Sequence, residues 1–170
     1  MKKVSKDIYD SILNIAKKAN EDGLVLEITI PNVSLYDWEI FLSEIREHHN
    51  HSFIGKCLGD PLPIQLDAVF FDAEEISLLV IDLNNYTLAC YFFDSNEIEL
   101  DLVPSALNDE NLDPLIGLVQ RIGKLLDKTV HISIEATNPV ISYSHGQFNV
   151  HCTNKPVTSR QAQNEIPMNF

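Results

Sequence analysis

The chain has 170 residues, of which 45% are hydrophobic, and carries a formal net charge of −13 at pH 7. This composition excludes an intrinsically disordered chain, and the shortness of the apolar runs excludes a membrane span. The charge is concentrated in residues 21–152, which hold 5 basic and 22 acidic side chains, so binding to nucleic acid is not expected.

The first predicted element is an amphipathic helix over residues 5–20, because apolar side chains recur there every three or four positions. Asn20 and Gly23 suit the end of this helix, since both residue types tolerate a positive φ. Alternation along residues 24–30 then predicts a β-strand, which Pro31 ends.

A second helix is predicted over residues 34–49, with Ser34 as its N-cap. Asp37 stands three residues later, where its carboxylate can complete a capping box. Residues 50–63 contain two glycines and two prolines and therefore indicate a loop.

Three consecutive strands are predicted in the centre of the chain, over residues 76–83, 86–93 and 98–103. Asn84-Asn85 suits a type I′ turn between the first two strands, so the three form an antiparallel meander. The run 78–81 is apolar at every position, which predicts a central strand that is covered on both faces. The third strand alternates apolar and acidic residues, which predicts one wet, acidic face.

The last predicted elements are a helix, a strand and a hairpin. Asp113 followed by Pro114 favours a helix start, and an apolar stripe extends this helix over residues 114–127. The remaining strands are expected over residues 130–134, 140–144 and 147–152, the last two joined at His145-Gly146.

These elements together predict one α+β domain over residues 1–152. Its centre is an antiparallel β-sheet of about five to seven strands, built around the meander, with about three helices packed on it. Residues 153–170 are polar, contain two prolines and are predicted to form a mobile C-terminal tail.

The three cysteines are Cys57, Cys90 and Cys152, and their odd number and wide spacing do not indicate a disulfide framework. The basic residues at the start of the chain are not followed by an apolar segment, so no secretory signal is predicted. A reducing cytoplasm is therefore the expected compartment. Cys90 and Cys152 alternate with apolar neighbours on predicted strands, and we expect both to be buried, reduced thiols.

The cluster His48-His49-Asn50-His51 is a candidate zinc site, with Cys57 as a fourth ligand. Zinc requires ligands that converge tetrahedrally, whereas adjacent residues at a helix end point apart. We therefore interpret these histidines as a solvated helix end, and the sequence predicts no metal and no other cofactor.

Motifs of common catalytic sites do not occur in the sequence, which has no G-x-S-x-G elbow, no G-x-G-x-x-G and no P-loop. The chain is therefore predicted not to be an enzyme. The alternative is a small intracellular enzyme that uses loop carboxylates or the His48–His51 cluster, because paired carboxylates can act in glycoside hydrolysis or bind hard metal ions.

Acidic residues gather in and around the central meander, where the simplest interpretation is solvated loop charges that aid solubility. Taken together they predict a surface that attracts a basic protein partner and accelerates the encounter. Tyr86 and Tyr143 are candidate anchors within this surface, although core packing is the favoured interpretation of both. The predicted partner-binding residues are Asp72, Glu74, Glu75, Asp94, Glu97, Glu99 and Asp101.

Several short motifs lie in order between Leu88 and Gly146. They are the aromatic stretch Tyr91-Phe92-Phe93-Asp94, the acidic strand 97–102, the helical segment 115–126, the stretch 128–130, the pair Ile134-Glu135 and the stretch 139–143. In this order they resemble immunity proteins of bacterial polymorphic toxin and contact-dependent growth inhibition systems.

This resemblance implies a protein that neutralises a cognate toxin by protein–protein association and has no catalytic residues of its own. Many toxins of this kind are basic nucleases, which the acidic central segment would suit. An adaptor domain, or a nucleic-acid mimic with another partner, is a further alternative beside the enzyme. The oligomeric state does not follow from any of these interpretations.

Overall fold

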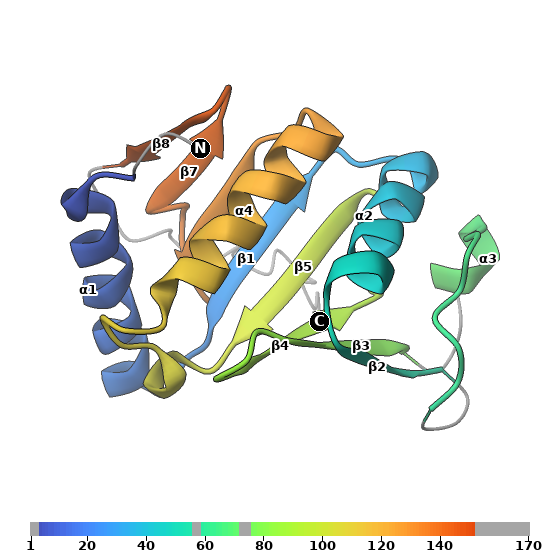
Figure 1. Ribbon diagram of the computed structural model, residues 1–170, viewed down its shortest axis with the longest axis horizontal. Coiled ribbons are helices and arrows are strands. Elements are labelled where there is room, and N and C mark those ends of the chain that lie inside the picture. Colours follow the sequence, from blue (N-terminus) through green and yellow to red (C-terminus); the bar gives the residue numbers. More distant parts are fainter. Residues whose placement is uncertain (1–3, 56–58, 72–75, 152–170) are drawn as a thin grey trace, which may run out of the picture.

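The computed structural model describes residues 4–55, 59–71 and 76–151, and these form an α+β fold around one antiparallel sheet (Figure 1). The eight strands are β1 Leu26–Pro31, β2 His51–Ile54, β3 Leu78–Asp82, β4 Thr87–Tyr91, β5 Glu97–Leu102, β6 Val130–Ile134, β7 Ile141–Ser144 and β8 Gln147–Val150. Their order across the sheet is β2-β3-β4-β5-β1-β6-β7-β8. The predicted meander is confirmed as β3-β4-β5, and β1 joins it to the C-terminal strands.

Three longer helices and two short ones complete the described part of the chain. They are α1 Lys6–Asp22, α2 Leu35–His48, α3 Ala68–Phe71, the 3₁₀ helix Pro104–Ala106 and α4 Leu112–Leu126. Figure 1 shows α2 and α4 lying across one face of the sheet, with α1 beside them. None of the helices in the described ranges is both long and apolar enough to span a bilayer.

Strand alternation gives the sheet two different faces. Leu26, Ile28 and Ile30 of β1 are at most 1% exposed and lie on the face that the helices cover. Glu27 and Thr29 lie on the opposite face, which no described helix covers and which we call the open face. The registers of the neighbouring strands extend both faces across the sheet.

The core between helices and sheet is closed by aromatic packing. Trp38 of α2 is fully buried and stacks on Phe92 with ring centroids 5.0 Å apart, while its indole N–H donates to the Ser95 carbonyl. On the other side, α4 approaches the sheet so closely at Gly123 that an added Cβ would stand 2.6 Å from the Tyr143 ring.

The helix limits agree with the sequence patterns to within a few residues. The capping box is confirmed, because the Ser34 hydroxyl accepts from the Asp37 amide and the Asp37 carboxylate accepts from the Ser34 amide. The third predicted helix begins earlier than expected, at Leu112, so Pro114 is its third residue instead of its first. A proline there still misses no helical hydrogen bond, because the first turn has none to lose.

Three local predictions are wrong. Residues 51–54 form strand β2 within the predicted loop, because pairing with β3 orders a segment whose own composition favours a loop. The strand predicted to be central and covered on both faces is β3, which lies second from the sheet edge. Its residues Leu78 and Val80 are only half-buried because they lie on the open face.

The expected type I′ turn is also absent from this connection. Asn84 has φ 72° and the Asn85 amide donates to the Leu83 carbonyl, which makes a γ-turn in which only Asn84 has a positive φ. Cys90 is confirmed as buried and free of a disulfide. Cys57, Cys152 and the predicted tail 153–170 lie outside the described residues.

Candidate functional site

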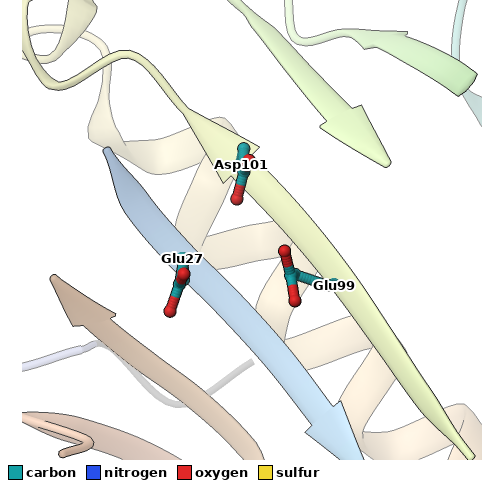
Figure 2. Close-up of side chains that lie close together, drawn as sticks. All are labelled: Glu27, Glu99 and Asp101. Carbon is teal, nitrogen blue, oxygen red and sulfur yellow. The ribbon is translucent and has the colours of Figure 1, made fainter. Parts of the chain in front are cut away.

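Three carboxylates converge on the open face at the centre of the sheet. Glu27 comes from β1, while Glu99 and Asp101 come from β5, and Figure 2 shows the three side chains side by side. One carboxylate oxygen from each residue lies within 4.8 Å of the others. Antiparallel pairing causes this convergence, since Glu27 is the direct cross-strand partner of Asp101 and Glu99 is the next residue on the same face. We call these residues the carboxylate triad.

The environment of the triad disfavours its negative charge. Partial burial, followed by repulsion from Asp101 and Glu27, raises the pKa of Glu99 to about 7. Burial and neighbouring carboxylates also raise the pKa values of Glu27 and Asp101, although a hydrogen bond from the Ala136 backbone lowers that of Glu27 in part. Glu97 and Glu135 add further negative charge near the triad.

Few groups among the described residues offset the negative charge of the triad. Asp101 Oδ1 is buried and has no hydrogen-bond partner among the described residues. None of the salt bridges between described residues includes a member of the triad. Clustered carboxylates without cations cost free energy, which a positive charge placed against them would recover.

An aromatic pair flanks the triad on the same face. Tyr91 of β4 is the cross-strand partner of Glu99, and its ring stacks on that of Phe93 with centroids 5.1 Å apart. Phe93 is 51% exposed. The half-buried side chains of Val80 and Ala89 continue this apolar area toward β3. The open face therefore combines a negative centre with an aromatic and aliphatic flank.

The opposite flank is polar. His131 of β6 is half-buried on the open face, and its pKa is lowered, first by burial and then by the charge of His151. The Ser142 hydroxyl and His151 Nε2 lie 2.8 Å apart and share a hydrogen bond. Donors and acceptors on this side suit hydrogen bonding to a ligand or partner that covers the sheet.

Comparison with family models, with curated proteins and with solved structures finds no match to this chain. Its function is therefore inferred from its own residues.

The structure brings together part of the predicted partner-binding set. Glu97, Glu99 and Asp101 all lie on the open face along β5, whereas Asp94 lies in the exposed β4–β5 turn. There its carboxylate accepts a hydrogen bond from the Asn96 amide. The remaining three predicted residues, Asp72, Glu74 and Glu75, lie outside the described ranges.

The favoured interpretation of Tyr86 and Tyr143 as core residues is confirmed. Tyr86 and Tyr143 are 7% and 2% exposed, so both belong to the core, and the Tyr86 hydroxyl donates to the Asn111 carbonyl. The aromatic side chains that lie on the open face beside the carboxylate triad are instead those of Tyr91 and Phe93. The sequence could have indicated these two residues, because alternation along the predicted strand 86–93 places residues 91 and 93 on the face opposite to Phe92.

The histidine cluster is distributed over different contacts. His48 Nε2 lies 3.6 Å from Glu44 Oε2, and His51 Nδ1 lies 2.9 Å from the His49 carbonyl oxygen. Within the described ranges, the grouping whose ligand atoms lie close enough for one metal ion is the carboxylate triad. Its oxygen atoms are of the type that Mg²⁺ and Ca²⁺ prefer.

Proposed function

We propose that this protein is a binding protein that receives a basic protein partner on the open face of its sheet. The observation that carries the proposal is the carboxylate triad, which is partly buried and lacks an ion pair among the described residues. A lysine or arginine of a partner would lower the cost of holding these carboxylates ionised. The formal net charge of −13 would also accelerate the approach of a basic protein.

The apolar flank offers the buried anchors that a tight interface needs in addition to charge. Tight interfaces depend on a few buried aromatic or aliphatic anchors, with charged groups that add specificity and association rate. Tyr91 and Phe93 are exposed enough to be covered by a partner and lie next to Glu99. We assign the anchoring role to this pair and the selection of a basic partner to the triad.

We further infer that the partner is a toxin and that the protein is its immunity protein. The motifs between Leu88 and Gly146 support this inference, and their acidic strand contributes Glu99 and Asp101 to the triad. Neutralisation by association needs a docking surface and no catalytic group. The enzyme alternative, which uses loop carboxylates or the His48–His51 cluster, stays a prediction.

The test is co-expression with the product of the adjacent gene, followed by co-purification and a growth assay. Protection is expected from the unaltered protein and is expected to be lost in the double variant Glu97→Lys, Glu99→Lys. The matched control is Asp10→Lys with Glu110→Lys, which makes the same change of charge at exposed positions away from the open face.

Three outcomes contradict parts of the proposal. A neighbouring product that is harmless alone, or that kills equally well in the presence of this protein, would show that there is no immunity function. Protection that survives the Glu97, Glu99 double reversal would place the contact elsewhere. An association rate that does not fall as salt shortens the screening length to about 8 Å would remove the electrostatic argument.

A further inference from the structure

A pocket of about 550 Å³ lies on the helical side of the molecule, away from the open face. It forms where the end of α2, the β3–β4 turn and the first half of α4 meet. Its walls include Arg46 and Glu47 of α2, Asp82 and Asn84 near the turn, and Gly117 and Arg121 of α4. Small-molecule sites fall in the range of roughly 300 to 1,000 Å³, so this pocket has the size for a metabolite.

Gly117 keeps one wall of the pocket bare. Glycine in a helix interior is less favourable than alanine, so a glycine there needs a structural explanation. For Gly123 of the same helix the reason is packing, because an added Cβ would meet the Tyr143 ring at 2.6 Å. At Gly117 an added Cβ would meet nothing within 4 Å. Packing therefore does not require this glycine, and its bare Cα leaves room in the pocket.

Two guanidinium groups are fixed at the pocket. Arg121 Nη1 donates to Glu44 Oε1 at 3.0 Å, and Arg46 Nη2 donates to the Pro63 carbonyl at 2.8 Å. Glu44 is only 8% exposed, so its carboxylate holds Arg121 in place from within the fold. Each of these bonds uses one of the five N–H donors of an arginine. The other donors are left for an oxyanion in the pocket, which a guanidinium binds with two parallel hydrogen bonds.

The wall also carries groups of the opposite character. Asp82 and Glu47 add carboxylates, while Asn50 and Asn84 add amides that both donate and accept. A polyanion would be repelled by these carboxylates and by the overall charge of the chain. A ligand that fits both kinds of group carries a single oxyanion together with amino or hydroxyl donors.

We propose that this pocket binds a small metabolite that carries one oxyanion, either a carboxylate or a phosphate monoester, together with amino or hydroxyl groups. Arg121 and Arg46 bind the oxyanion, and Asp82 and Glu47 accept hydrogen bonds from the donor groups. This site is separate from the open face, so it is independent of the proposed partner.

The experiment is an NMR titration of the amide-labelled full chain, observed at Gly117 and its neighbours. The probes are free L-amino acids, which present a carboxylate with an amine, and hexose 6-phosphates, which present a phosphate with hydroxyls. Acetate and inorganic phosphate serve as bare anions. We expect saturable shifts with one of the two organic classes at concentrations up to about 10 mM, which detects millimolar dissociation constants. The class that binds identifies the source of the oxyanion.

Two variants and a control locate the binding. Gly117→Leu places a side chain in the pocket from a Cβ that meets nothing within 4 Å and is expected to abolish binding. Arg121→Gln is expected to raise the dissociation constant at least about tenfold, as loss of a charged hydrogen bond does. Lys124→Gln removes the same charge from an exposed position on the same helix and is expected to leave binding unchanged.

The proposal is overturned if no organic probe shifts the Gly117 region, or if bare anions bind as tightly as the organic ligands. It is equally overturned if Gly117→Leu binds as the unaltered protein does. Thermal unfolding of each variant shows whether it is folded, and Gly117→Leu provides the test if loss of the Glu44 partner unfolds Arg121→Gln.

Discussion

Replacement of Glu99 by glutamine is expected to stabilise the free protein, and to do so only toward neutral and higher pH. Glutamine has the shape of the protonated side chain and removes the repulsion within the carboxylate triad. The pKa of Glu99 is raised from 4.5 to about 7 by burial and by neighbouring carboxylates. The folded protein therefore holds this proton more tightly than the unfolded chain does between these two pH values.

This difference in proton binding determines how the stability of the fold changes with pH. The contribution of the protonated side chain is fully present below pH 4.5 and is lost as pH rises through about 7, so stability falls with rising pH. A shift of this size corresponds to about 3 kcal/mol for a fully buried group. Solvent screening of a partly exposed carboxylate reduces the expected effect to about 1 kcal/mol.

The assay is urea unfolding followed by the fluorescence of Trp38, the single tryptophan, which is fully buried against Phe92. Glu99→Gln and the unaltered protein are expected to have similar free energies of unfolding at pH 4 and to differ by about 1 kcal/mol at pH 8. Glu110→Gln, at an exposed loop position, is the control and should show no such divergence. A difference that is absent at pH 8, or that does not change with pH, would refute the reasoning.

Three further predictions concern the core. Gly123→Ala is expected to lower the free energy of unfolding by about 1 to 3 kcal/mol, because the Tyr143 ring stands 2.6 Å from the new Cβ; an increase in the melting temperature would contradict the close approach. Trp38→Ala is expected to cost about 3 to 5 kcal/mol in calorimetry, since it empties the centre of the aromatic cluster. Cys90 is buried and its thiol pKa is raised, so a thiol reagent should label it only at the rate of unfolding; rapid labelling of native protein would contradict its placement.

Much of the fold could be predicted from local patterns. Apolar periodicity predicted α1, α2 and α4, and Ser34 with Asp37 marked a helix start that needs no tertiary information. Alternation predicted the meander β3-β4-β5. Local patterns do not say which strands are neighbours, however, so residues 51–54 were assigned to a loop until their pairing with β3 was known.

The candidate site depends on which strands are neighbours, and local patterns do not show this. Glu99 and Asp101 were predicted from the acidic alternation of one strand, but Glu27 joins them only because β1 pairs with β5. Tyr86 and Tyr143 were considered both as anchors and as core residues, because composition does not reveal which face of a strand the helices cover. Gly117 carried no signal in the sequence, since a glycine inside an amphipathic helix has the same pattern whether it lies against a ring or a pocket.

The position of β1 between β5 and β6 constrains how the chain reaches its native state. This strand is synthesised early, yet its two partners come much later, so both of its edges stay unpaired while the rest of the chain is made. Leu26, Ile28 and Ile30 are exposed during that interval, in a segment that favours pairing with other extended chains. Folding must therefore close long loops before its central ladder forms, which predicts slow folding and a need for protection of the nascent chain.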